Sequence, residues 1–193
     1  MIILIGGASC CGKTTMAQRL LERYHMNYLS IDHLKMGLIR GSKYCDFTAS
    51  DSDDSLTDKL WPIIKGIIMT NIENDQNLII EGCYIPTDNI CSFNPEYQEH
   101  IIAFFLGFNE QYILENLQSG IIDHRSETEY KDIDYMQNNI YFLKTNKLQK
   151  ERCKLNNVMF FEIATDYTKD IQKVYDWVDI QVQKKKLLRF NKC

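Results

Sequence analysis

The stretch Gly7-Ala8-Ser9-Cys10-Cys11-Gly12-Lys13-Thr14 has the pattern G-x-x-x-x-G-K-[ST], and it decides the fold of this 193-residue chain. It follows an apolar run at 2–5 that is typical of a buried strand, and it precedes residues whose apolar side chains recur at helical spacing. In such a loop, backbone amides and the helix N-terminus direct N–H groups toward phosphate oxygens. The sequence therefore predicts a Walker A motif, or P-loop, that binds a nucleoside triphosphate.

The motif also predicts individual roles. We expect Lys13 to reach the β and γ phosphates and the Thr14 hydroxyl to coordinate Mg²⁺, an ion that prefers oxygen ligands and few protein groups. The alternative is a solvated glycine turn before an amphipathic helix. The predicted phosphate-binding residues are Gly7, Ala8, Ser9, Cys10, Cys11, Gly12, Lys13, Thr14 and Thr15.

Composition limits the class of protein. The chain has 22 basic and 26 acidic residues, a net charge of −4, which argues against a surface that binds duplex nucleic acid. Its apolar runs are too short for a membrane span or a signal-peptide core. We expect a cytoplasmic protein without nucleic-acid or membrane partners, folded as a single domain over 1–193 and present as a monomer or homodimer.

Seven cysteines lack any C-x-x-C pair, so we expect reduced thiols and no zinc site. Cys10 and Cys11 lie inside the P-loop, where Lys13 and a helix N-terminus should lower a thiol pKa. We therefore expect these thiols to be alkylated readily and to be protected by bound nucleotide.

Further apolar runs at 28–31, 78–80, 101–106 and 158–161 suit buried strands. Helical patterns lie near 13–25, 55–74, 109–119, 132–155 and 168–183. This alternation predicts an α/β fold of three layers, with a central five-stranded parallel sheet and helices on both faces. The polar stretch 41–58 is predicted to be a mobile loop, and 118–134 a mobile lid.

Two carboxylates follow predicted strands directly. Asp32 comes after the second strand and Glu81 after the third, so both belong at the sheet edge that carries the P-loop. Phosphoryl transfer needs one acidic group to order Mg²⁺ or its waters and another to orient or deprotonate the attacking hydroxyl. The sequence leaves open which residue does which. Alternatively, Asp32 caps the following helix and Glu81 is an exposed residue at a strand end.

Other nucleotide-binding classes fit less well. A GTPase needs an N-K-x-D motif, and the nearest string, at 146–149, lacks the aspartate. A motor or ring-forming ATPase needs a longer chain with more arginines than the six found here.

Three segments together carry a family resemblance: GGASCCGKTT at 6–15, SIDHLKMGLIRG at 30–41 and LIIEGCYIP at 78–86. They resemble small-molecule P-loop kinases of the adenylate kinase-like group, particularly proteins labelled 2-phosphoglycerate kinase. The resemblance covers most of the chain in order. It implies Mg²⁺-dependent transfer of the γ-phosphoryl group of ATP to a small-molecule acceptor.

The resemblance implies further site residues. Asp32 would face the acceptor hydroxyl, and Glu81 would lie near the metal or the acceptor. Arg125, in the predicted lid, would neutralise the transferring phosphoryl group. Many relatives carry two lid arginines; here Arg125 would act alone or with Lys131, or the assignment is incorrect.

Three other residues complete the candidate site. Thr165 and Asp166 follow the last strand, where related kinases hold adenine through backbone atoms, although either residue could equally cap a helix. Arg40 would bind an anionic acceptor or be solvated. The acceptor pocket itself would be built from 33–75, where no motif names a metabolite.

Two further functions remain open: an ATP-binding regulatory module with slow or no transfer, and a kinase of nucleic-acid ends. The acidic balance disfavours the second.

Overall fold

The structure is a computed structural model that describes residues 1–123 and 139–190. Its centre is a parallel sheet with strand order β2-β3-β1-β4-β5. The strands are β1 (Ile2–Gly7), β2 (Tyr28–Ser30), β3 (Leu78–Glu81), β4 (Ile101–Phe108) and β5 (Met159–Ile163). The predicted five-stranded parallel sheet is confirmed.

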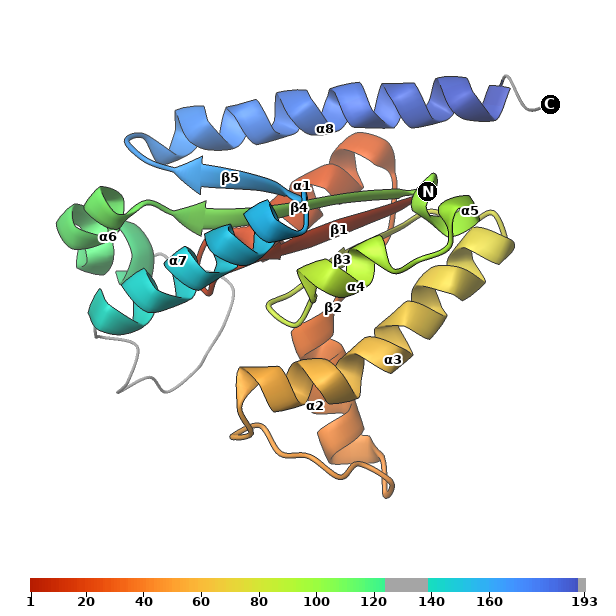
Figure 1. Cartoon of the computed structure of the whole chain (residues 1–193), viewed down its shortest axis with the longest axis horizontal. Coiled ribbons are helices and arrows are strands. Elements are labelled where there is room, and N and C mark those ends of the chain that lie inside the picture. The colour runs from red at the N-terminus through yellow and green to blue at the C-terminus, as the bar shows by residue number, and fades with distance from the viewer. Residues whose placement is uncertain (124–138, 191–193) are drawn as a thin grey trace.

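Helices follow the strands in the expected alternation. They are α1 (Lys13–Tyr24), α2 (Ile31–Gly41), α3 (Asp53–Glu73), α4 (Thr87–Cys91), α5 (Pro95–Gln98), α6 (Glu110–Asn116), α7 (Asn139–Leu155) and α8 (Tyr167–Phe190), with a π-helical turn η1 (Leu117–Ile122) after α6. Figure 1 shows the long α8 lying along one face of the sheet and α3 beside the opposite face.

Two apolar cores occupy the two faces. Every residue of β1 is buried, and its side chains alternate between the cores. Ile3 and Ile5 pack with α1 and α8, whereas Ile2 and Leu4 pack with α3. Continuous apolar strands are required because helices cover both faces of the sheet. The predicted three-layer arrangement is confirmed.

Several predicted boundaries change. The loop expected at 41–58 is shorter, because α3 already begins at Asp53. Ser52 caps this helix, its hydroxyl accepting from the Ser55 amide at 3.3 Å. Two short helices, α4 and α5, were not predicted, since neither is long enough to show a helical period. The last helix extends beyond the expected residue 183.

Candidate active site

The strand register brings the predicted site residues to one edge of the sheet. Glu81 at the end of β3 pairs with Ile5 of β1 on one side and with Ser30 of β2 on the other. Asp32 follows Ser30 by two residues, and the P-loop continues from the end of β1. The carboxylates and the P-loop therefore share the carboxyl edge of three neighbouring strands, where open α/β sheets bind ligands.

Two P-loop glycines are required by the backbone. Gly7 has φ +132°, and a β-carbon there would lie 2.0 Å from the Leu106 carbonyl oxygen. Gly12 has φ +86°, and a β-carbon there would lie 1.9 Å from the Tyr167 hydroxyl. Any other residue would be strained and would clash at both positions. The loop is thus packed tightly between β4 and the start of α8.

Lys13 is a buried cation within this loop. Its side chain folds back so that Nζ donates to the Ala8 carbonyl at 2.6 Å. Burial by itself lowers the pKa of Lys13, but the groups of Cys11 and Cys83 and, after them, the carboxylates of Glu81 and Asp32 together hold that pKa well above its usual range. The lysine therefore stays protonated and can neutralise phosphate charge.

Glu81 is a buried carboxylate at the end of β3. The residue is 2% exposed, and within the part of the chain that the structure describes Oε1 has no hydrogen-bond partner. Burial raises the pKa of Glu81, whereas the hydroxyls of Ser30 and Thr14 and the charge of Lys13 oppose that rise. A buried carboxylate oxygen beside the Thr14 hydroxyl is the donor set that Mg²⁺ prefers, so these residues fit the predicted ion.

We expect Glu81→Gln to raise the Tm of the nucleotide-free protein at pH 7. A raised folded-state pKa contributes stability below the unfolded pKa, and this stability is lost as pH rises through the folded pKa. Removing the charge removes that loss, so the gain should shrink as the pH is lowered below about 4. Thermal melts at both pH values check this; a lower Tm for the variant at pH 7 would contradict it.

Asp32 belongs to a buried polar cluster that the sequence did not reveal. It lies in the first turn of α2, which Ser30 precedes, so Asp32 is not the residue that caps this helix. Lys35, one turn later and 3% exposed, donates to Asp32 Oδ1 at 2.7 Å and to the Tyr84 hydroxyl at 2.8 Å. The i,i+3 spacing of Asp32 and Lys35 was the only sequence signal for this ion pair.

Arg40, Arg125 and Lys131 are the other basic residues predicted for the site. Arg40 is exposed in the last turn of α2, and Lys35 is the buried cation of that helix. Arg125 and Lys131 lie outside the described residues, as does the predicted lid beyond residue 123. The described part of that lid, 118–123, consists of η1 without its first residue, followed by Asp123.

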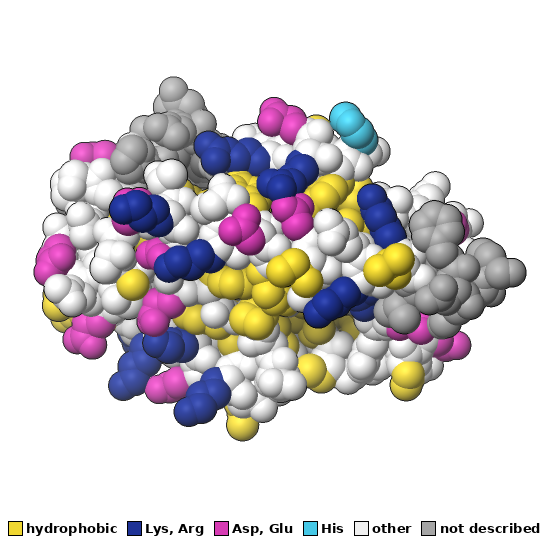
Figure 2. Space-filling view, turned by 90° about the horizontal axis from the view of Figure 1, so that it is seen from above, with side chains coloured by type: hydrophobic (Ala, Val, Ile, Leu, Met, Phe, Trp, Pro, Cys, Tyr) yellow, Lys and Arg dark blue, Asp and Glu magenta, His cyan; other side chains and the backbone are white. Residues whose placement is uncertain are grey.

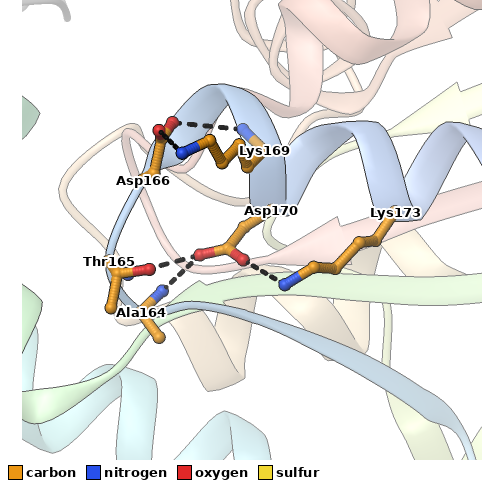
Figure 3. Close-up of polar contacts among 6 residues, drawn as sticks. All are labelled: Ala164, Thr165, Asp166, Lys169, Asp170 and Lys173. Atoms are coloured by element: carbon orange, nitrogen blue, oxygen red, sulfur yellow. Dashed lines mark hydrogen bonds and ion pairs between the residues drawn. The ribbon is translucent and has the colours of Figure 1, made fainter.

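The loop after β5 is held by two aspartates (Figure 3). Asp166 caps α8, its Oδ1 accepting from the Lys169 amide at 3.1 Å. Asp170 is buried, and its Oδ2 accepts from the amides of Ala164 at 2.9 Å and Thr165 at 3.3 Å. The capping alternative stated for Asp166 is therefore correct, and Asp170 is a residue that sequence reasoning missed.

Asp170 also ionises unusually easily. Its Oδ1 pairs with Lys173 Nζ at 2.6 Å, and this contact together with the two amides lowers the pKa of Asp170 from 3.8 to about 2. Because this carboxylate is buried and fully bonded, it ties the loop firmly to α8.

We expect Asp170→Asn to destabilise the protein by about 2 kcal/mol at pH 7. A depressed pKa contributes stability that is complete above the unfolded value of 3.8 and disappears as pH falls toward about 2. The difference from wild type should therefore shrink between pH 4 and pH 2. Urea unfolding over this range measures it. Asp176→Asn, at an exposed position on the same helix, should change little; a pH-independent difference for Asp170→Asn would be the contrary result.

One P-loop thiol, that of Cys11, differs from expectation. The six cysteines in the described part of the chain are free. Cys11 is completely buried and donates to the Ala8 carbonyl at 2.9 Å, and burial raises its pKa to about 11 despite the nearby Lys13. The prediction of a lowered pKa at Cys11 is wrong, because loss of water around the thiolate outweighs the lysine charge.

Among the described residues, no cluster of three or more histidine, cysteine, aspartate or glutamate side chains could hold a metal ion.

Comparison with solved structures identifies the fold. An uncharacterised protein from Eubacterium ventriosum is 17% identical, with 93% of this chain and 98% of that chain covered, at a TM-score of 0.50. A proposed kinase from Chloroflexus aurantiacus is 15% identical, with coverage of 93% and 97% and a TM-score of 0.51. Shikimate kinase from Bacteroides thetaiotaomicron is 12% identical, with coverage of 93% and 98% and a TM-score of 0.50.

The chain has the α/β fold of these three proteins. No protein-family model and no curated protein sequence matches it. Within the described residues, every helix is too short or too polar to span a membrane.

Proposed function

We propose that this protein is an ATP-dependent kinase that requires Mg²⁺ and transfers the γ-phosphoryl group to a small-molecule acceptor. The observation that carries the proposal is the buried Glu81 carboxylate beside Lys13 and Thr14, and one oxygen of that carboxylate has no partner in the part of the chain that the structure describes. Burying a carboxylate oxygen without a hydrogen-bond partner costs free energy. A bound ligand that contacts this oxygen explains why the protein tolerates that cost.

The site residues divide the work of transfer. Lys13 and the P-loop amides hold and neutralise the β and γ phosphates. Thr14 and Glu81 would hold Mg²⁺, which when bound supplies further neutralisation of phosphate charge. Placing both residues at the metal leaves Asp32 for the acceptor.

Asp32 is the proposed acceptor-side group. It aligns the acceptor oxygen and takes its proton as the new O–P bond forms and the bond between the γ phosphorus and the bridging oxygen breaks, with ADP as leaving group. Lys35 keeps one carboxylate oxygen fixed, so the orientation of Asp32 is set before substrate arrives. Catalysis in this scheme consists of positioning and electrostatics.

A phosphorus NMR screen tests the proposal. ATP and Mg²⁺ are incubated with pooled sugar acids, nucleosides, nucleotides and phosphorylated three-carbon acids, including 2-phosphoglycerate. One new phosphoester that depends on Lys13 supports the kinase. Tight ATP binding with no new phosphoester and no acceleration of ADP release from any pool contradicts it and favours the regulatory module.

The same screen can include oligonucleotides with free 5′-hydroxyl groups. On the face shown in Figure 2, basic and acidic side chains are interspersed rather than gathered into a basic stripe. This pattern gives no support to a nucleic-acid substrate, for which binding should fall steeply with added salt.

A further inference from the structure

Three of the described cysteines lie at the predicted phosphate site. Cys10 and Cys11 belong to the P-loop, and Cys83 follows Glu81 by two residues at the end of β3. The Cys83 sulfur lies 3.9 Å from the Ser9 hydroxyl oxygen, so the end of this strand and the P-loop meet at this thiol. The proposed transfer of phosphate uses none of the three sulfurs.

The three thiols differ in their access to solvent. Cys11 is completely buried and donates to the Ala8 carbonyl, so a reagent in solution cannot reach it while the loop keeps this form. Cys10 and Cys83 are half-buried. Cys83 also lies beside Lys13: burial lowers the pKa of Lys13, and Cys11 and Cys83 are the two groups that raise it most. Cys83 is therefore an accessible thiol next to the cation that would neutralise the phosphates.

The backbone around Cys83 is held in place. The Gly82 amide donates to the Ile5 carbonyl at 3.1 Å, and a β-carbon at Gly82 would lie 2.8 Å from Ile31 Cβ, so this segment is packed between β1 and α2. Tyr84, the residue after the cysteine, is buried, and its hydroxyl accepts a hydrogen bond at 2.8 Å. Because the chain is fixed on both sides of Cys83, a group attached to its sulfur is directed over the P-loop, where the phosphates would bind.

We propose that Cys83 is a modification site for disulfides of low-molecular-weight thiols, and that the adduct closes the nucleotide site reversibly. The Cys83 sulfur attacks one sulfur of the disulfide: a new S–S bond forms, the old one breaks, and the other half leaves as a thiol that carries the proton lost by Cys83. The disulfide is the oxidant, since the half that leaves is reduced as Cys83 is oxidised. A free thiol removes the adduct by the same exchange. The inference rests on the proposed nucleotide site and adds its regulation.

Oxidised glutathione and a fluorescent ATP analogue test the proposal on the whole protein. Reduced protein is treated with oxidised glutathione, and peptide mass spectrometry identifies the modified cysteines. Binding of the analogue is measured before treatment, after it, and after addition of dithiothreitol. We expect an adduct on Cys83, a loss of affinity of at least about tenfold, and full recovery with dithiothreitol. ATP at about ten times its Kd should slow modification of Cys83 about tenfold, since only the nucleotide-free protein reacts.

Two substitutions separate Cys83 from the other thiols. Cys83→Ser keeps a small polar side chain beside Ser9, and its affinity for the analogue should be the same before and after treatment. Cys91→Ser is the matched control, because Cys91 is an exposed cysteine on α4. This control should lose affinity on treatment as wild type does. Circular dichroism of treated wild type should match that of the untreated protein.

Several results would overturn the proposal. They are absence of an adduct on Cys83, an adduct that leaves affinity and its protection by ATP unchanged, and loss of affinity in treated Cys83→Ser, where another thiol would be responsible. Unfolding of treated wild type would also overturn it, because the adduct would then act on the fold and not on the site. If reduced wild type binds no triphosphate, the proposed function fails together with this inference, whereas binding that is insensitive to oxidised glutathione removes the inference only.

Discussion

Replacement of Lys13 by alanine is expected to abolish phosphoryl transfer, lowering kcat by about a thousandfold or more. The side chain is a buried cation, and among the described residues its hydrogen bonds stay within the P-loop, to the Ala8 carbonyl at 2.6 Å and the Cys11 thiol at 4.0 Å. When phosphates occupy the loop, this ammonium group can exchange those neutral partners for negatively charged phosphate oxygens. Because it lies in a site of low dielectric, its effect on developing charge is much larger than that of a solvated lysine.

Steady-state kinetics with the acceptor found by the NMR screen measures this loss. Lys150→Ala is the matched control, because Lys150 is an exposed lysine that pairs with Glu162 on α7 and β5, away from the P-loop. Thermal melts establish that both variants are folded. Full turnover in Lys13→Ala would show that the P-loop does not act on the phosphates as proposed.

Replacement of Asp32 by asparagine is expected to lower kcat by about a hundredfold to a thousandfold while ATP affinity changes by less than about threefold. The carboxylate accepts the proton of the acceptor hydroxyl, and an amide cannot. ATP affinity is spared because the phosphates are held by the P-loop, whereas Asp32 lies on α2 and pairs with Lys35, which also donates to the Tyr84 hydroxyl.

The loss of charge at Asp32 also affects Lys35, which is left buried without its ion-pair partner, so some loss of stability is expected. Tyr84→Phe is the matched control: it removes the hydroxyl on Lys35 but keeps the carboxylate and the aromatic ring. It should retain most of the turnover. A variant Asp32→Asn with wild-type kcat, or with a defect confined to ATP binding, would remove Asp32 from the proposed role.

Some residues of the candidate site could be predicted from the sequence, and others could not. Glu81 and Asp32 were predicted at the P-loop edge because each directly follows an apolar strand, and the register of parallel strands fixes where their carboxyl ends lie. Lys35 was not predicted, because its position in the sequence does not show that its side chain is buried. That burial depends on the contact with Tyr84, a residue distant in the chain. Asp170 was missed for a similar reason: its partners are loop amides that depend on how α8 meets β5.

The pKa of Cys11 was predicted wrongly for the same reason, because the sequence does not show burial. The sequence identified a lysine and a helix N-terminus near Cys11, and both lower a thiol pKa. Complete burial has the opposite and larger effect, and burial is a property of the packed molecule.

The sequence by itself determined the alternation of the five strands with the longer helices, the P-loop and the two carboxylates at the strand ends beside it, because each depends on local spacing and on strand ends. Only the tertiary structure decided which side chains are desolvated and which hydrogen-bonding groups are already occupied. Those properties distinguish the buried Lys35 from the exposed Arg40, leave an oxygen of Glu81 without a partner among the described residues, and hold the amides of Ala164 and Thr165 on Asp170. Desolvation and hydrogen-bond satisfaction arise from segments distant in the chain, so neither can be read from spacing alone.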